Sequence, residues 1–439
     1  MVWPQIFCDD LKMQMAGRVQ AAIDVLTEVL TRHRPASEAL KDWGKAHRFA
    51  GSGDRHAIGT LVYDGLRQRR SAGAQGGGED ARNVILGVLR GGWGMNVDEI
   101  AALADGAHGP QGLSAAERAA LAAVPRDLPW QVVANVPDWL VPVFVQQFGK
   151  KAEAEAQAMC ERAPIDLRVN SLKADAAKVS AALAVHNPVA GPWVSTSLRI
   201  ALTSPQQKHV NVETDPAHGM GWFEVQDTAS QIAAALSGVI PGETVLDICA
   251  GAGGKTLALA ALMQNKGRLV AHDVDKHRLR PIFERVMRAG ASCVEVVSAD
   301  AAVASLLPGS FDCVVVDAPC SGTGTWRRKP ETKWKLTQKT LDTRLIEQKG
   351  VLERSAVLVR SGGRLVYYTC SILPDENIRQ VEGFLKAHKD FKIVPYAEQW
   401  ERTIGGAVPK SADGRNDTLL LTPHSHGVDG FFVAVMVRG

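Results

Sequence analysis

From residue 221 onward the sequence alternates between short apolar runs and longer amphipathic runs, and this alternation constrains the fold more than any other feature. The apolar runs have the length and β-branched composition of buried strands, and the runs between them repeat apolar residues at helical spacing. This pattern predicts an α/β domain with a doubly wound, Rossmann-like parallel sheet, whose ligands bind outside the carboxyl ends of the strands. A closing antiparallel hairpin is predicted over 418–437. The predicted parallel strands are TVLDI (244–248), GRLVAHD (267–273), VEVVSAD (294–300), FDCVVVDAP (311–319) and GRLVYYTCS (363–371).

The regions before this domain have different patterns. Residues 1–140 carry Ala and Leu at helical spacing and predict an all-helical domain, in which the glycine-rich stretch 69–80 predicts a loop or helix break. Residues 141–220 predict a small α+β subdomain with PIDLRVNSLK (164–173) as a strand. Either this strand contributes a basic nucleic-acid contact at Arg168, or the subdomain only connects its neighbours. The predicted domains are therefore 1–140, 141–220 and 221–439.

Charge and cysteine usage limit the possible classes of function. The chain has 50 Lys and Arg against 47 Asp and Glu, so a nucleic-acid surface has to be a local patch. No apolar run approaches the ~18–20 residues that span a bilayer, and the first residues do not have the pattern of a signal peptide. The seven cysteines include no Cys-x-x-Cys pair, which argues against a disulfide framework and a spaced zinc site. We therefore expect a cytoplasmic protein with no metal and no membrane partner. A monomer is expected as well, although no sequence feature indicates the oligomeric state.

The turn after the first predicted strand reads DICAGAGGKT, from Asp247 to Thr256. A phosphate-binding P-loop needs glycine where Cys249 stands, and the dinucleotide fingerprint needs glycine at Thr256, so both motifs fail. What remains is a tight glycine turn that opens a helix. Such a turn lets a ligand approach the backbone closely.

Acidic residues end the next predicted strands. Asp273 and Asp275 end the second strand, where a carboxylate can bind ribose hydroxyls, and Asp300 ends the third, where a polar group can reach an adenine edge. This arrangement fits a nucleoside ligand without pyrophosphate, and S-adenosylmethionine is such a ligand. The alternative is a set of turn glycines and surface acids that bind nothing.

Two cysteines stand at the carboxyl ends of neighbouring predicted strands. Cys320 follows the fourth strand in DAPCSGTG, and Cys370 follows the fifth in YYTCS, so both are expected to face one crevice. A thiolate is a good nucleophile when nearby groups lower its pKa. The other cysteines are expected to be small core residues: Cys8, Cys160, Cys249, Cys293 and Cys313.

These groups suit methylation at carbon 5 of cytosine, which is itself a poor nucleophile. A thiolate that adds to carbon 6 turns the ring into an enamine, and the enamine can attack a sulfonium methyl. Loss of the carbon 5 proton and elimination of the thiol then release the product. A carboxylate such as Asp317 can hold the amino group and the protonated nitrogen 3 of the ring. Cysteine, acid and sulfonium donor form one consistent set.

Basic and aromatic residues interleave directly after the first cysteine motif, from Thr325 to Lys335. Basic side chains bind phosphates and aromatic rings stack on unpaired bases, so this segment predicts an RNA contact beside the site. The alternative is a solvated loop whose tryptophans lie in the core. The predicted RNA-binding residues are Arg168, Trp326, Arg327, Arg328, Lys329 and Lys333.

At these residues the sequence resembles the Sun/Fmu (RsmB-like) family of bacterial RNA (cytosine-5-)-methyltransferases. The resemblance is carried by DAPCSGTG, YYTCS with the following PDENIRQVEGFL, VQDTASQ, PIDLRVN and DGFFVAVMVR. The family loop usually reads Cys-Ala-Ala-Pro-Gly-Gly-Lys-Thr, whereas Gly251 and Ala252 replace its third and fourth residues here. The helical N-terminal third resembles the NusB-like RNA-binding domain of the subgroup that modifies small-subunit ribosomal RNA.

The resemblance implies a role for each site residue. Cys370 is then the nucleophile, Cys320 helps to release methylated RNA from the covalent adduct, and Asp317 lies beside the base and the methyl donor. Asp273 matches the family better than Asp275, because it comes first at the strand end. The implied S-adenosylmethionine contacts are Cys249, Ala250, Gly251, Ala252, Gly253, Gly254, Lys255, Asp273, Asp300 and Asp317, and Lys255 is also expected to orient the active-site loop.

The implied product is 5-methylcytosine in ribosomal RNA, with 16S rRNA as the expected target, and three alternatives remain. The first is the same chemistry on transfer RNA or 23S rRNA. The second is a DNA enzyme, which uses the cysteine of a Pro-Cys pair as its nucleophile, and that residue here is Cys320. The third is a ribosome-assembly factor without catalysis, which would not need to bind S-adenosylmethionine.

Overall fold

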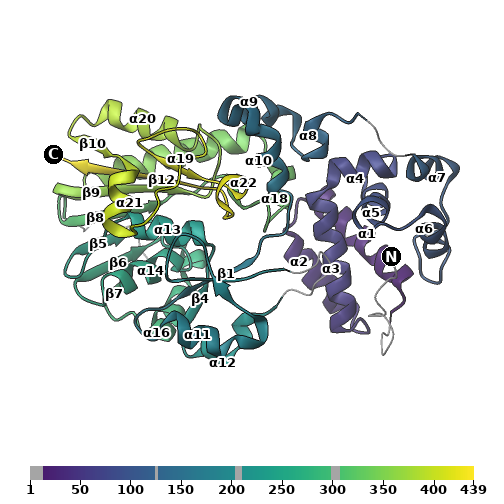
Figure 1. Ribbon diagram of the computed structural model, residues 1–439, viewed down its shortest axis with the longest axis horizontal. Coiled ribbons are helices and arrows are strands. Elements are labelled where there is room, and N and C mark those ends of the chain that lie inside the picture. Colours follow the sequence, from purple (N-terminus) through teal and green to yellow (C-terminus); the bar gives the residue numbers. More distant parts are fainter. Residues whose placement is uncertain (1–12, 124–126, 203–209, 298–306) are drawn as a thin grey trace.

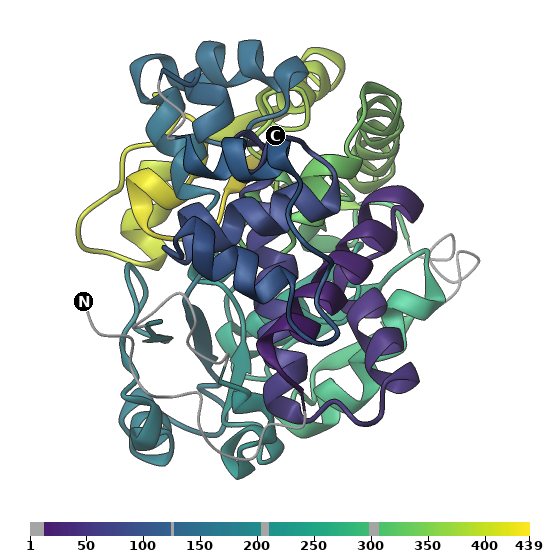
Figure 2. The same cartoon turned by 90° about the vertical axis from the view of Figure 1, so that its right-hand side faces the viewer.

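The structure is a computed structural model that describes residues 13–123, 127–202, 210–297 and 307–439. Figure 1 shows a helical region at one end of the molecule and a larger α/β region at the other, and Figure 2 shows the helical region from its outer side. None of the helices in the described ranges is both long and apolar enough to cross a membrane. The same ranges contain no group of three side chains that could hold a metal ion.

The N-terminal region is all helical, as predicted. Val19, Ala22 and Leu26 lie on one face of the first helix and are buried in a core shared with the third and fifth helices. The helices are α1 (Met15–Arg32), α2 (Ala36–Ala46), α3 (Ser52–Arg67), α4 (Arg69–Gly76), α5 (Ala81–Gly87), α6 (Val97–Ala104) and α7 (Ala115–Ala122).

The prediction of a loop over 69–80 is wrong for its first part, because Arg69–Gly76 forms helix α4. Gly76 allows α4 and α5 to approach each other, and Gly77, with φ of 89°, ends α4, so the predicted break lies at 77–80. A β-carbon on Gly76 would lie 1.9 Å from the carbonyl oxygen of Asn83, and one on Gly87 would lie 1.8 Å from that of Ala72. Close packing of α4 against α5 therefore requires glycine at both contacts.

The large sheet confirms the predicted Rossmann-like architecture. Its strands are β5 (Thr244–Asp247), β6 (Arg268–His272), β7 (Val294–Val297), β8 (Phe311–Asp317), β9 (Val359–Thr369), β10 (Phe391–Val394), β11 (Leu419–Leu421) and β12 (Phe431–Arg438). They lie in the order β10-β12-β9-β8-β5-β6-β7, with β11 paired to β12. The strands from β9 to β7 are parallel, whereas β12 is antiparallel to β9, β10 and β11. The predicted hairpin is therefore present, and it also extends the sheet beyond β9.

Helices cover both faces of this sheet, because successive strand residues point to opposite sides. Val245 and Val315 pack under α13 (Thr228–Leu236) and α14 (Gly254–Leu262). Leu246 and Val314 pack under α19 (Gln338–Ala356) and α20 (Ile378–Ala387). Among the described residues of this region, further α-helices are α15 (Lys276–Leu279), α16 (Ile282–Ala289), α18 (Glu331–Lys335), α21 (Tyr396–Thr403) and α22 (Pro423–His426).

A small antiparallel sheet lies between the helical region and the large sheet in sequence. Its strands are β1 (Ile165–Val169), β2 (Val189–Ala190), β3 (Ser197–Ile200) and β4 (Phe223–Val225), in the order β2-β3-β1-β4. Helices α11 (Ala176–Ala182) and α12 (Pro216–Gly219) accompany this sheet. Strand β1 confirms the predicted strand, and β4 carries the small sheet past residue 220.

Three helices between the helical region and β1 join the large α/β region. They are α8 (Trp130–Val133), α9 (Val141–Phe148) and α10 (Ala152–Ala158). Leu140, Phe144 and Ala156 belong to the same buried cluster as Val314 of β8. The packing of residues 134–159 is thus continuous with the core of the large sheet.

Candidate active site

A cleft of about 1430 Å³ lies at the carboxyl ends of β5, β6, β8 and β9. It brings together most of the site residues that the sequence predicts, from four separate strand ends. Asp300 lies outside the described residues, and so does Cys8. The predicted residues that line the cleft are Cys249, Ala250, Gly251, Ala252, Gly254, Lys255, Asp273, Asp275, Asp317, Cys320 and Cys370.

The two strand-end cysteines meet in this cleft. The Sγ atoms of Cys320 and Cys370 are 3.4 Å apart. The parallel register of β8 and β9 pairs Asp317 with Tyr368, so the two loops leave the sheet side by side. The backbone N–H of Gly324 donates to the carbonyl of Cys370 at 2.9 Å and ties the loops together.

The environment keeps Cys320 protonated. Its pKa is raised well above that of an ordinary thiol by its hydrogen bond with the Cys370 thiol, then by burial and by the negative charges of Cys370 and Glu376. A protonated thiol is a poor nucleophile but can act as a proton donor.

Asp317 is held in place by a lysine. Its Oδ2 atom lies 2.9 Å from the ammonium Nζ of Lys255, which also donates to the Ser230 hydroxyl at 3.0 Å. Both side chains line the cleft, and Asp317 is the more open of the two, with 31% of its side chain exposed against 5% for Lys255. A buried cation that fixes a partly open carboxylate can orient it toward a bound base.

The glycine turn is held open by Asp273. Its Oδ2 atom accepts the backbone N–H of Gly251 at 2.9 Å, and its Oδ1 atom accepts that of Asp275 at 2.9 Å. Gly251 has φ of 50° and Gly253 has φ of 85°, and a β-carbon on Gly253 would lie 2.5 Å from Ile282. Asp275 instead accepts the N–H of His277 and begins α15. Asp273 thus supports the backbone of the glycine turn, whereas Asp275 caps a helix, and both residues line the cleft.

Asp247, at the end of β5, has an unusual protonation behaviour. Burial raises its pKa from 3.8 to about 7, against the opposing effect of a hydrogen bond from the Thr256 hydroxyl at 2.7 Å. The folded state therefore binds a proton that the unfolded chain releases at lower pH.

This carboxyl is expected to make stability depend on pH. Its contribution is fully present below about pH 4, the unfolded pKa, and is lost as the pH rises through about 7. Urea unfolding at several pH values measures the slope. The Asp247→Asn variant keeps the size and the Thr256 contact but cannot titrate, so its unfolding free energy should change less with pH between 4 and 7. An unchanged slope would rule out Asp247 as its source.

The predicted RNA-binding residues are mostly buried. Arg168, Trp326, Arg327 and Lys333 have exposed fractions of 5% or less. Trp326 stacks on Phe144 in the core of the large sheet, with ring centroids 6.1 Å apart. Their placement favours the alternative of core tryptophans for this part of the segment.

Arg168, Arg327 and Arg328 are not open surface cations either. Burial lowers the pKa of Arg168 to about 10. Arg327 and Arg328 pair with Asp429 at 2.7 and 2.5 Å, and Arg328 also pairs with Asp227 at 2.7 Å. Arg328 is partly exposed and Lys329 is exposed.

The segment that follows Cys320 also reaches the helical region. The indole Nε1 of Trp334 donates to the carbonyl of Leu66 at 2.7 Å, and the Arg67 guanidinium donates to the carbonyl of Arg327 at 3.2 Å. Trp334 packs against the helical core. One stretch of chain thus contacts both the cysteine site and the end of α3.

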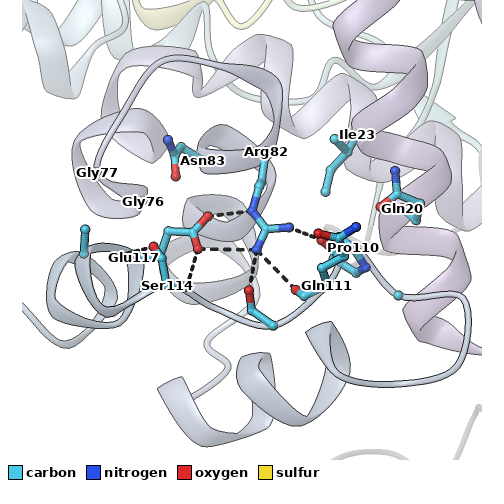
Figure 3. Close-up of a pocket in the computed structure, with 13 residues that line it drawn as sticks. Gln20, Ile23, Gly76, Gly77, Arg82, Asn83, Pro110, Gln111, Ser114 and Glu117 are labelled. Carbon is cyan, nitrogen blue, oxygen red and sulfur yellow. Dashed lines mark hydrogen bonds and ion pairs between the residues drawn. The ribbon is translucent and has the colours of Figure 1, made fainter.

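A pocket of about 860 Å³ in the helical region is organised around Arg82 (Figure 3). The Arg82 guanidinium lies 2.5 Å from a Glu117 carboxylate oxygen. It also donates to the backbone carbonyls of Pro110, Gln111 and Gly112. These bonds tie the loop before α7 to α5, which gives the pocket a structural role.

Glu376, which is not among the predicted site residues, accepts hydrogen bonds from both cysteine loops. A carboxylate three residues into the PDEN turn after YYTCS is the signal that could have pointed to it. Its contacts depend on a meeting of distant segments, so sequence spacing does not show them.

Comparisons with known proteins match most of the chain. A family model described as 16S rRNA methyltransferase RsmB/F matches residues 235–437, and a model for the ferredoxin-like domain of RsmF/B-like methyltransferases matches residues 136–207. A probable ribosomal RNA small subunit methyltransferase B from Synechocystis sp. is 34% identical over 311 residues, covering 68% of this chain and 66% of that protein. The Bacillus subtilis protein of the same description is 34% identical over 313 residues, with the same coverage.

A solved structure extends the likeness to the whole chain. The crystal structure of PH0851 superposes with a TM-score of 0.75 at 26% identity, covering 98% of this chain and 100% of that one. By sequence, the chain spans about two thirds of the length of the curated relatives that it matches.

Proposed function

Because the chain belongs to the RsmB/F methyltransferase family, we propose that it methylates carbon 5 of a cytosine in small-subunit ribosomal RNA, with S-adenosylmethionine as the methyl donor. The observation that carries this proposal is the 3.4 Å approach of the Cys320 and Cys370 thiols in a cleft that also holds Asp317. Two thiols and a carboxylate around one space fit covalent activation of a pyrimidine ring.

The residues of the cleft fit the methyl donor. The glycine turn lets a ligand approach the backbone, and the Asp273 carboxylate beside it suits the hydroxyls of a ribose. When bound, S-adenosylmethionine supplies an activated sulfonium methyl. Residues 249–255 would hold it together with Asp273.

Side chains of the protein carry out the addition to the base, its orientation and the final elimination. Cys370 adds to carbon 6 of the cytosine and forms a carbon–sulfur bond, while Asp317, oriented by Lys255, binds the amino group and protonated nitrogen 3. After methylation, water takes the proton from carbon 5, the electrons of that bond re-form the ring double bond, and the Cys370 sulfur leaves carbon 6 as a thiolate. Cys320, whose Sγ atom lies 3.4 Å away, donates its proton to the departing sulfur and is reprotonated by water. Nitrogen 3 then gives up its proton, which leaves 5-methylcytosine and both cysteines as thiols.

The test is a methylation assay on the purified full chain. Protein, S-adenosylmethionine and unmodified 16S rRNA are incubated, and the nucleosides are analysed by mass spectrometry. We expect 5-methylcytosine, with bisulfite sequencing showing one or few positions, while 23S rRNA and transfer RNA serve as competing substrates. Modification of either competitor in preference to 16S rRNA would change the assigned substrate. No product together with no cofactor binding would indicate an assembly factor.

An arginine-lined cleft supports RNA docking between α3 and the catalytic region. It has a volume of about 370 Å³, and Asp64 is the acidic side chain in its described lining. Three of its arginines pair with carboxylates: Arg67 with Asp64, Arg327 with Asp429, and Arg328 with Asp227 and Asp429. Such a cleft suits the phosphates of an RNA strand. The arginines are Arg55, Arg67, Arg162, Arg327 and Arg328.

Replacing Arg55 and Arg162 together by Gln is expected to weaken RNA binding without changing its sequence preference. Loss of two phosphate contacts should reduce the slope of log affinity against log salt by about 1.4 for a single strand. We expect KM for RNA to rise roughly tenfold, with kcat nearly unchanged, since phosphate contacts position the strand. Fluorescence anisotropy over a salt series measures the slope.

The matched control replaces Arg32 and Arg268 by Gln. Both arginines are exposed, with side-chain exposures of 74% and 48%, and neither lines the cleft. The control removes the same net charge, so a change that follows charge alone would appear in both double variants. Equal slopes in the two variants would exclude this cleft as the docking surface.

A further inference from the structure

Glu376 is a fully buried carboxylate that joins the two cysteine loops. Its Oε1 atom accepts the backbone N–H of Ser321 at 2.7 Å, and its Oε2 atom accepts the hydroxyls of Ser321 and Ser371, each at 2.5 Å. Ser321 follows Cys320 directly, and Ser371 follows Cys370. One carboxylate therefore contacts the neighbours of both thiols.

The remaining contacts extend this network to α19. The amide Nε2 of Gln348 donates to Glu376 Oε1 at 3.1 Å and to the carbonyl of Pro319, just before Cys320, at 2.9 Å. The hydroxyl of Thr323 lies 2.9 Å from that of Ser371 and links the loops a second time. Burying a carboxylate is costly unless donors compensate it, and four neutral donors surround this one.

The Glu376 backbone is itself anchored to β9. The Tyr367 hydroxyl donates to the carbonyl of Glu376 at 2.6 Å. The adjacent Asn377 donates to the carbonyl of Ser371 at 2.9 Å and accepts the Thr369 hydroxyl at 2.5 Å. The strand that carries the Cys370 loop thus fixes the carboxylate, which in turn fixes the Cys320 loop.

We propose that Glu376 is a positioning residue that holds the Cys320 loop against the Cys370 loop, so that both thiols reach the same base. The expected effect of Glu376 on kcat rests on the proposed methyl transfer. The holding of the two cysteine loops by Glu376, here called the loop clamp, does not depend on that function. The negative charge of Glu376 also contributes to the raised pKa of Cys320, after the effects of Cys370 and burial. Removing that charge should therefore make Cys320 ionise at lower pH.

The Glu376→Gln variant tests the clamp with little change in size. The substitution removes the charge. It leaves one acceptor oxygen, whereas the two carboxylate oxygens of Glu376 accept three hydrogen bonds from the loops. A shift of about 1 Å in a reacting group can cost about 10²-fold in rate, so we expect kcat to fall by about that factor. Cofactor affinity should change less than about twofold, because Glu376 does not line the cleft.

The matched control is Glu155→Gln. Glu155 is equally buried and accepts the hydroxyl of Ser425 at 2.6 Å, but it lies on α10 and does not line the cleft. The same chemical change there should lower stability without changing kcat. Thermal unfolding of both variants separates a loss of stability from a loss of positioning.

Two readouts do not need RNA. Dibromobimane bridges neighbouring thiols, and mass spectrometry identifies the bridged peptides. We expect the Cys320–Cys370 bridge in the wild type and in Glu155→Gln, and much slower bridging in Glu376→Gln. In a Cys370→Ala background, alkylation of Cys320 by iodoacetamide should begin at lower pH when Glu376 is Gln.

The outcomes separate this inference from the proposed function. Wild-type bridging and kcat in Glu376→Gln would overturn the clamp, even if the enzyme methylates rRNA. A wild type without methyl transfer would overturn the proposed function, and the bridging rate would still decide the clamp. If Glu376→Gln does not fold, Ser321→Ala serves as the test variant, because it removes one hydroxyl donor and keeps the carboxylate. The Cys320–Cys370 bridge must then form more slowly in Ser321→Ala than in the wild type and in Glu155→Gln.

Discussion

Replacement of Cys370 by Ala is expected to abolish methyl transfer while the protein stays folded and still binds S-adenosylmethionine. Without addition at carbon 6, carbon 5 of the cytosine remains a poor nucleophile. Loss of a covalent nucleophile costs on the order of 10⁴-fold or more in rate. Cys370 is only partly buried, so its truncation should change the unfolding free energy by about 1 kcal/mol. Transfer of tritiated methyl groups to rRNA measures the rate.

The control for this variant is Cys293→Ala. Cys293 is also a free, partly buried cysteine, but it precedes β7 and does not line the cleft. Its replacement removes the same thiol group, so near wild-type activity is expected. Full activity in Cys370→Ala would falsify the nucleophile assignment, because no other group in the proposal forms the carbon–sulfur bond.

Replacement of Cys320 by Ala is expected to give an enzyme that forms the covalent adduct with the base but releases it slowly. Cys370 can still add to carbon 6, whereas elimination loses the thiol that lies 3.4 Å from it. General acid or base groups contribute about 10² to 10⁴-fold, so release should slow by at least about 10²-fold. A protein–RNA band that survives denaturing electrophoresis measures the trapped fraction.

The pair of variants also decides which cysteine attacks. RNA that contains 5-fluorocytosine traps the attacking thiol, because fluorine at carbon 5 blocks the elimination. Trapping is expected with Cys320→Ala and not with Cys370→Ala. The reverse result would make Cys320 the nucleophile, as in the DNA-type alternative, and would leave the methylation chemistry itself intact.

The strand ends of the catalytic region were predictable from the sequence, because the strands are continuous apolar runs and carboxyl ends of parallel strands share one edge. This reasoning placed Cys320 and Cys370 in one crevice, and the structure confirms that they meet there. The antiparallel pairing of β11 with β12 confirms the predicted hairpin, but the insertion of β12 between β9 and β10 depends on pairing over a long sequence distance.

Other features depend on tertiary contacts that spacing does not reveal. The run from Lys276 to Gly290 predicts one helix, whereas the structure divides it into α15 and α16 around Pro281, where proline removes a backbone donor. The basic segment after Cys320 has the composition of an exposed RNA contact, yet Trp326 and Lys333 fill the core. A charged side chain enters the interior when its neighbours compensate it, and those neighbours come from distant parts of the chain.

The stretch from Trp326 to Lys335 joins the end of α3 to the loop that carries Cys320. If RNA binds the helical region more tightly in one arrangement of this stretch than in another, the position of the Cys320 loop changes with it. Thermodynamic linkage then works in both directions, so a ligand that favours one position of this loop changes the affinity for RNA by the same factor as RNA changes the affinity for that ligand. With such coupling, a correctly bound RNA would itself help to assemble the site that modifies it.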